Sequence, residues 1–169
     1  MRRAAQGTDR SGETDLRKDA LQRCGALLAS RDYSEKKLRE KLGGDGYPAD
    51  VIDGVIQELK DAHYVDDARI AGQYVRLHLT DRSMERIRQD LYRMGIDGET
   101  ASDALREAGQ ENDLESAQET QIRALLRKRR YPGEDADPGT KQKTMAFLYR
   151  KGYPADLIRH VLDTYLQSD

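Results

Sequence analysis

Two groups of basic side chains are the residues of this sequence best suited to chemistry, and that chemistry is the binding of anions. The denser group is a run of eight residues that carries five positive charges: Arg123, Arg127, Lys128, Arg129 and Arg130. The second group is Arg82, Arg86 and Arg93, which helical spacing places near one side of a helix. Guanidinium and ammonium groups pair with phosphates and carboxylates, so either group could meet DNA or an acidic protein surface.

Both basic groups also have a purely structural explanation. The helix expected before Arg130 begins with Asp113 and Glu115 and ends basic, as the helix dipole favours. Around Arg82 and Arg86, Glu85 and Asp90 offset part of the positive charge. Five positive charges in eight residues exceed what a dipole needs, so both groups are kept as candidate partner-binding residues.

Residues that could support catalysis or hold a metal are sparse. Asp66 and Asp67 could form a carboxylate pair for acid–base chemistry, but aspartates just before a helical stripe are more often helix caps. The three histidines share no ligand spacing, and the single cysteine, Cys24, allows no internal disulfide and no cysteine-based metal site. We therefore expect no enzymatic activity, no metal and no cofactor.

Composition restricts the class of protein further. The 169 residues carry 29 Lys and Arg against 31 Asp and Glu, so nucleic-acid binding would need a local basic face rather than bulk attraction. A hydrophobic share of 37% is low for one round core and favours an elongated helical protein. No apolar run is long enough to span a membrane, and the N-terminus lacks the apolar core of a signal peptide. We expect a cytoplasmic monomer, with residues 1–14 as a disordered lead-in.

An internal repeat organises the chain. The sequence GYPAD occurs at Gly46–Asp50 and again at Gly152–Asp156, and apolar residues follow both copies at helical spacing. A weaker third copy contains Gly95, and the three units start 49 and then 57 residues apart. This self-similarity predicts an all-α fold, an elongated tandem array of three three-helix repeats at 15–64, 65–110 and 111–169, whose neighbours share a core.

Each repeat contains residue types that start and stop helices. A hydroxyl residue can cap a helix N-terminus, a glycine can end a helix in the left-handed conformation, and a proline can fix φ where the next helix begins. These residues are Ser34, Ser83 and Thr140 for the caps, Gly46, Gly95 and Gly152 for the helix ends, and Pro48 and Pro154 for the next starts. A binding role for Tyr47 and Tyr153 is the alternative interpretation of GYPAD.

Two stretches resemble the RecX family, the recombination regulators of bacteria. They are ALLASRDYSEKKLREKLGGDGYPADVIDGVIQELKDAHYVDDARIAGQYV and RSMERIRQDLYRMGI, within a likeness that runs from about Leu21 to Leu105 and more loosely beyond. Its specific part is a combination: Arg31, Tyr33-Ser34, Leu38, Leu42, Gly46, Leu59 and Tyr64-Val65-Asp66-Asp67. The family often has a Gly-Pro pair where Arg82-Ser83-Met84 stand, a change that leaves Ser83 able to cap.

The resemblance implies a protein without catalytic activity whose partner is the RecA recombinase. Family members lie in the helical groove of the filament that RecA forms on single-stranded DNA. There they restrain filament growth and damp strand exchange, ATP hydrolysis and the stimulated self-cleavage of the SOS repressor, and so modulate DNA repair. The implied fold is the same stack of three-helix repeats, and a weak direct contact with DNA stays open.

Two other classes of function remain open. One is a stand-alone DNA- or RNA-binding protein that uses its short helices in helix-turn-helix fashion, against which the near-neutral net charge counts. The other is a generic helical scaffold, which the irregular spacing of 49 and 57 residues disfavours.

The repeat pattern generates a prediction of shape. Because each repeat is joined only to its neighbours, small-angle X-ray scattering should give a radius of gyration above the roughly 15 Å of a compact chain of this length. A value at or below the compact one would contradict the linear array.

Overall fold

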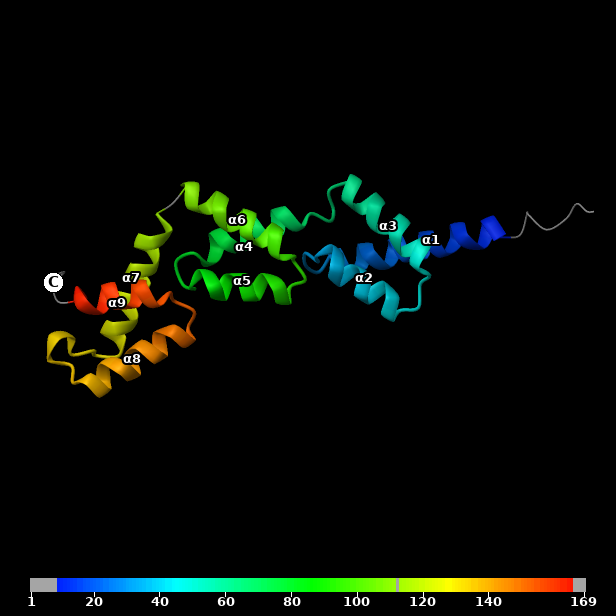
Figure 1. Cartoon of the computed structure of the whole chain (residues 1–169). Helices are drawn as coiled ribbons and strands as arrows, with labels where there is room; N and C mark the ends of the chain where they lie inside the picture. The colour runs from blue at the N-terminus through cyan, green and yellow to red at the C-terminus, as the bar shows by residue number, and fades with distance from the viewer. Residues whose placement is uncertain (1–8, 112, 166–169) are drawn as a thin grey trace, which may run out of the picture. The chain divides into compact units, whose positions relative to one another are not determined.

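The computed structural model describes residues 9–111 and 113–165, whose path is drawn in Figure 1. Over these residues it contains nine α-helices, one short 3-10 helix and no strand. They are α1 (Asp9–Leu28), α2 (Glu35–Gly44), α3 (Ala49–Asp61), α4 (Asp67–His78), α5 (Met84–Arg93), α6 (Gly98–Glu111), α7 (Leu114–Lys128), η1 (Gly133–Asp135), α8 (Pro138–Arg150) and α9 (Ala155–Asp163). The all-α prediction is confirmed for this part of the chain. None of the described helices has both the length and the apolar character needed to cross a bilayer.

Contacts within the chain divide it into two compact units. One unit holds the chain up to Ile70 together with Arg93–Asp97. The other holds Ala71–Tyr92 together with the chain from Gly98 onward. The first unit therefore contains α1, α2, α3 and the start of α4, and the second contains the rest of α4, nearly all of α5, and α6 to α9.

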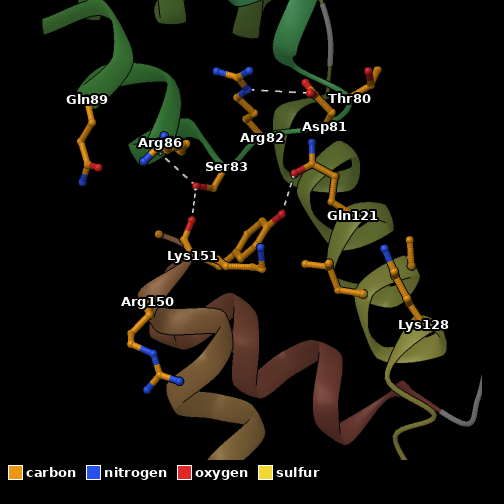
Figure 2. Close-up of a pocket in the computed structure, with 14 residues that line it drawn as sticks. Thr80, Asp81, Arg82, Ser83, Arg86, Gln89, Gln121, Lys128, Arg150 and Lys151 are labelled. Carbon is orange, nitrogen blue, oxygen red and sulfur yellow. Dashed lines mark hydrogen bonds and ion pairs between the residues drawn. The ribbon is translucent and has the colours of Figure 1, made fainter. Parts of the chain in front are cut away.

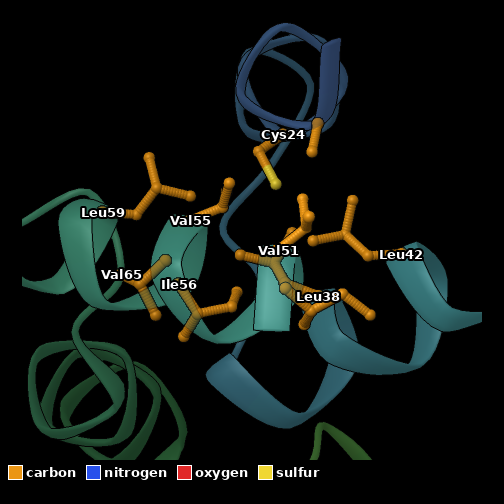
Figure 3. Packing of buried hydrophobic residues seen from close by; sticks show 10 residues of the cluster. Cys24, Leu38, Leu42, Val51, Val55, Ile56, Leu59 and Val65 are labelled. Atoms are coloured by element: carbon orange, nitrogen blue, oxygen red, sulfur yellow. The ribbon is translucent and has the colours of Figure 1, made fainter. Parts of the chain in front are cut away.

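The core of the first unit forms where α1, α2 and α3 meet. Each helix contributes an apolar stripe of 3.6-residue periodicity, and Figure 3 shows these side chains converging. The buried residues are Ala20, Cys24, Leu38, Leu42, Val51, Ile52, Val55, Ile56, Leu59 and Val65. The Cys24 thiol is free and lies inside this core, where burial raises its pKa.

Ser34 connects α2 to the next repeat within the first unit. Its oxygen accepts the backbone N–H of Lys37 at 3.3 Å, which caps α2, and its hydroxyl donates to the carbonyl of Met94 at 2.6 Å. The following Gly95 has φ +88°, a backbone conformation that is energetically unfavourable for any residue with a Cβ. A Cβ added there would also lie 2.6 Å from the Ser34 oxygen. We call this arrangement a serine junction: a capping serine that donates to the carbonyl just before a left-handed glycine.

The second unit repeats the serine junction. The Ser83 oxygen accepts the backbone N–H of Arg86 at 3.2 Å at the start of α5, and its hydroxyl donates to the carbonyl of Lys151 at 2.6 Å. Gly152 has φ +90°, and an added Cβ would lie 2.8 Å from the Ser83 oxygen. By contrast, Gly46 has the same φ of +90° but has nothing within 4 Å of an added Cβ.

The third repeat has a core of its own within the second unit. It forms among α7, α8 and α9, and consists of Ile122, Leu126, Tyr131, Leu148, Tyr153, Leu157, Ile158, Val161 and Leu162. Pro154 is the N-cap residue of α9 with φ −62°, as Pro48 is of α3 with φ −60°. Both copies of GYPAD therefore end one helix at glycine and begin the next after proline.

Two predictions about helix starts are corrected. Thr140 is not the N-cap of α8: the cap is Asp137, whose carboxylate accepts the Thr140 backbone N–H at 3.0 Å and its hydroxyl at 2.6 Å. Asp137 takes the role because the helix begins at Pro138, whose missing N–H costs nothing there. α1 begins at Asp9, so residues 9–14 are helical rather than part of a disordered lead-in. The rest of that predicted lead-in, residues 1–8, lies outside the described residues.

The glycines generate a prediction of unequal stability effects. Gly46→Ala should lower the free energy of unfolding by roughly 1–2 kcal/mol, because a Cβ is strained at this φ. Gly152→Ala should lower it further, because the Cβ also meets the Ser83 oxygen. Chemical denaturation measures both. Gly54→Ala, inside α3 with nothing near the added Cβ, is the control and should stabilise by roughly 0.5–1 kcal/mol. Equal losses at Gly46 and Gly152 would contradict the role of the serine junction.

Candidate functional site

A partly open, basic pocket of about 720 Å³ lies within the second unit. Its walls come from α5 and the turn before it, from α7, and from the C-terminal end of α8, as Figure 2 shows. Five of its lining residues are cationic: Arg82, Arg86, Lys128, Arg150 and Lys151. Two amides, Gln89 and Gln121, and one carboxylate, Asp81, also line it. The pocket is therefore suited to an anionic ligand.

A buried carboxylate holds the two arginines of the α5 wall. Asp90 lies one turn after Arg86, and its side chain is only 10% exposed. Its Oδ2 atom lies 2.7 Å from Arg82 Nη1 and 3.2 Å from Arg86 Nε. Tyr74 completes the network: its hydroxyl donates to Asp90 at 3.2 Å and accepts from Arg82. Because one enclosed carboxylate oxygen accepts from both arginines, Asp90 restrains where the two guanidinium groups lie, while the Arg82 and Arg86 side chains stay 33% and 48% exposed.

The network shifts the pKa values of its acidic members in opposite directions. Burial by itself would raise the pKa of the Asp90 carboxyl, but the hydrogen bond from Arg82, the charge of Arg86 and the hydrogen bond from Tyr74 together lower it. Burial, followed by the charge of Asp90, raises the pKa of the Tyr74 hydroxyl. Asp90 is thus an ionised acceptor and Tyr74 a neutral donor at neutral pH.

The α7 wall rests on a second chain of hydrogen bonds. The Tyr153 hydroxyl donates to Gln121 Oε1 at 2.9 Å, and Gln121 Nε2 donates to the carbonyl of Leu79. Burial, with the charge of Asp81, raises the pKa of Tyr153 to about 12. Tyr153 is thus a buried structural residue at the pocket, and Tyr47 is a half-buried one that donates to Asp19. The hydroxyls of both GYPAD tyrosines are therefore engaged in hydrogen bonds within the chain.

The structure divides the predicted basic run of α7 into separate environments. Only Lys128 lines the pocket, where it joins Arg82 and Arg86 of the other predicted group. Arg123 donates to the carbonyl and hydroxyl of Thr164 at 3.2 and 2.9 Å, which ties α7 to the end of α9. Arg127 and Arg129 are exposed, and the Arg129 guanidinium lies 4.1 Å from the centre of the Phe147 ring.

Arg130 and Arg93 lie at the ends of helices. Arg130 is exposed, and with φ +52° it occupies a left-handed backbone position just after α7. Arg93 is the last residue of α5 and is also exposed. Neither lines the pocket.

The paired aspartates have structural roles in the first unit. Asp66 Oδ1 accepts the backbone N–H of Arg69 at 2.8 Å and caps α4. Asp67 Oδ1 accepts the backbone N–H of Glu35 at 3.0 Å, and burial raises the pKa of its carboxyl. No cluster of three or more His, Cys, Asp or Glu side chains that could hold a metal occurs among the described residues.

Sequence reasoning missed Arg150, Lys151, Gln89 and Gln121 as pocket residues. A signal for the first was present, because LYR-x-G occurs in both the second and the third repeat and aligns Arg150 with Arg93. The others could not be found this way, because Gln89 and Gln121 are single polar residues on helices and Lys151 is the C-cap residue of α8, and only folding brings them together.

Comparison with known proteins identifies the family. Models of the first, second and third three-helix domains of RecX match residues 20–59, 66–105 and 117–162 respectively. The chain belongs to the RecX family. The prediction of three three-helix repeats in tandem is thereby confirmed, and the resemblance noted in the sequence extends through the third repeat.

Individual relatives agree with this assignment. The Regulatory protein RecX of Clostridioides difficile is 33% identical over 147 residues, which cover 85% of this chain and 66% of that protein. The protein of the same name from Chromohalobacter salexigens is 31% identical over 89% of this chain and 92% of its own length. The crystal structure of RecX from Lactobacillus salivarius matches with a TM-score of 0.76 and 25% identity, over 91% of this chain and 96% of that one.

The Asp90 network generates a prediction of pH dependence. Asp90→Asn should lower the free energy of unfolding by roughly 1–3 kcal/mol at neutral pH, because two arginines lose an ionised acceptor. Since the folded-state pKa lies below the ordinary 3.8, the advantage of the wild type is full above about pH 5 and is lost as the pH falls through that lowered value. Denaturation at several pH values measures the difference.

The matched control for this experiment is Asp103→Asn. Asp103 pairs with Arg106 at 2.9 Å, but both side chains are largely exposed, so the change should have little effect at any pH. A wild-type advantage over Asp90→Asn that stayed constant down to pH 2 would show that Asp90 is not the ionised centre of the network.

Proposed function

We propose that this chain is a regulator of the RecA recombinase. It binds the filament that RecA forms on single-stranded DNA, within the helical groove, and restrains filament growth, strand exchange, ATP hydrolysis and coprotease activity. By this route it modulates DNA repair and the SOS response, and it acts as a non-catalytic monomer in the cytoplasm. The observation that carries the proposal is that RecX family models match all three repeats in order.

The arrangement of charge supports binding to a polyanionic filament. Basic residues of two repeats, Arg82 and Arg86 on one side and Lys128 on the other, line one pocket of the second unit. Arg127 and Arg130 add exposed charge beyond it. A filament repeats its subunits, so a chain of repeats with boundaries at 15–64, 65–110 and 111–169 suits contacts at more than one subunit.

The test is the inhibition of single-stranded-DNA-dependent ATP hydrolysis by RecA. Arg127→Glu combined with Arg130→Glu should raise the concentration needed for half inhibition by about tenfold, or about 1.4 kcal/mol. These side chains are chosen because they are exposed, whereas reversal of Arg82 or Arg86 would set a carboxylate against Asp90 and destabilise the fold. Added salt should have the same effect as the reversal.

Lys143→Glu is the matched control. Lys143 is exposed on α8 but does not line the pocket, and an acidic residue in the first turns of a helix is tolerated by its dipole. Inhibition should therefore be unchanged. Wild type that leaves ATP hydrolysis and strand exchange untouched at saturation would refute the regulator proposal. Equal inhibition by wild type and the double variant would refute only the choice of Arg127 and Arg130.

A stand-alone nucleic-acid-binding protein is the second candidate. The basic pocket is the observation that favours it, and the net charge of −2 is the observation against it. A measurement of nucleic-acid binding in the absence of recombinase separates the two candidates, because only the regulator requires recombinase for its effect.

A further inference from the structure

A tyrosine followed by an arginine occupies the same place in the second and third repeats. The two pairs are Tyr92-Arg93 at the C-terminal end of α5 and Tyr149-Arg150 at the C-terminal end of α8. The leucines just before them, Leu91 and Leu148, are fully buried, whereas the tyrosines are 70% and 67% exposed. The end of an equivalent helix therefore presents a large aromatic ring to solvent twice.

The first repeat shows that this pair is not needed to end the helix. There α2 ends with Gly43 and Gly44 at the corresponding places, between the buried Leu42 and the left-handed Gly46. All three repeats keep the buried leucine and, four residues later, the left-handed glycine that ends the helix. A single exposed tyrosine needs no explanation, but an exposed pair that recurs at equivalent positions, where folding does not require it, indicates a binding role.

The serine junctions hold the two pairs in matching local settings. The residue after each arginine is Met94 or Lys151, and its carbonyl accepts the hydroxyl of Ser34 or Ser83 at 2.6 Å in both cases. The glycines that follow have φ +88° and +90°. The backbone that carries each tyrosine therefore has the same relation to its own junction, so equivalent sites on a partner would meet each pair in the same way.

Helix α5 sets the spacing of the two tyrosines within the second unit. Lys151 is bonded to Ser83 at the start of α5, as Figure 2 shows, so Tyr149 lies near that start. Tyr92 comes nine residues after Ser83, and nine residues advance about 14 Å along a helix axis. One small ligand cannot engage both rings across that distance. The two pairs therefore suit two separate points on a large partner.

The chemistry of each pair suits a protein surface. Tyrosine and arginine are the residue types, with tryptophan, that most often dominate the binding energy of protein interfaces. The ring fills an apolar notch, and a guanidinium beside it pairs with a carboxylate. Stacking on nucleic-acid bases accepts any exposed ring, so it gives no reason for the same arginine to stand beside both tyrosines.

We propose that Tyr92-Arg93 and Tyr149-Arg150 dock on the same surface of two neighbouring subunits of one protein polymer. Identical pairs in identical settings bind identical sites, and a polymer of one kind of subunit offers such sites at a fixed spacing. On each subunit the tyrosine enters an apolar notch that a carboxylate borders. The identity of the polymer, a RecA filament, rests on the proposed function.

The experiment is co-sedimentation of the full chain with RecA filaments assembled on single-stranded DNA. Tyr92→Ala and Tyr149→Ala should each weaken binding by about tenfold, and by equal amounts. Because the sites are separate, the double variant should lose about a hundredfold. Tyr64→Ala is the matched control: Tyr64 is 64% exposed but lies between α3 and α4 rather than at the end of a helix before a serine junction, so its removal should leave binding unchanged.

The outcomes separate the docking pairs from the proposed function. Because both rings are largely exposed, the variants should keep wild-type helicity and melting, so a loss of binding reports on contact. Wild-type binding by the double variant, or a loss confined to one tyrosine, would overturn the paired docking while the regulator proposal stands. Equal weakening of binding to oligothymidylate without recombinase would show that the rings stack on bases, and would overturn the protein partner. Wild type that does not sediment with the filaments would refute the regulator proposal and this docking together.

Discussion

The fold depends on a serine hydroxyl that accepts one hydrogen bond and donates another. As an acceptor, Ser34 or Ser83 caps its own helix. As a donor, it bonds the carbonyl of the residue just before a left-handed glycine, 60 residues from Ser34 and 68 from Ser83. A hydroxyl can do both because it has one proton and two lone pairs. The geometry requires glycine at positions 95 and 152, since a Cβ would collide with the serine oxygen. Gly46, which no serine approaches, needs glycine only for its φ.

The pocket is a consequence of the second serine junction. Ser83 begins α5, which carries Arg86 and Asp90, and its bond to Lys151 fixes the end of α8, which carries Arg150. The Tyr153–Gln121–Leu79 chain fixes α7 beside them. The hydrogen bonds that hold the repeats together are therefore those that bring cations of separate repeats to one cavity. Repulsion among the cations of the pocket acts against the hydrogen bonds that bring these helices together. The stability of the junction and the charge of the pocket are therefore coupled.

The sequence predicted local features well and long-range partners poorly. Helical stripes, the glycine ends and the GYPAD turns follow from spacing within about ten residues, so the repeat pattern located them. The Thr140 assignment failed because Asp137, before a proline, is the better-placed acceptor for the same first turn. Arg123 looked like part of a binding run, but its partner Thr164 is 41 residues away and no local pattern reveals it.

The net charge of −2 does not describe what this chain can bind, because several of its acidic residues take part in local structure. Asp66, Asp113 and Asp137 cap helices, and Asp90 is enclosed by two arginines and a tyrosine. These carboxylates offset positive charge in the net charge of the chain, but they do not neutralise the pocket, because they bind backbone N–H groups or enclosed side chains. Among the described residues, Lys128 and Arg150 of the pocket make no ion pair with a carboxylate. A ligand that approaches within a Debye length of about 10 Å responds to this local excess rather than to the sum over the chain, so a nearly neutral protein can still present a site for a polyanion.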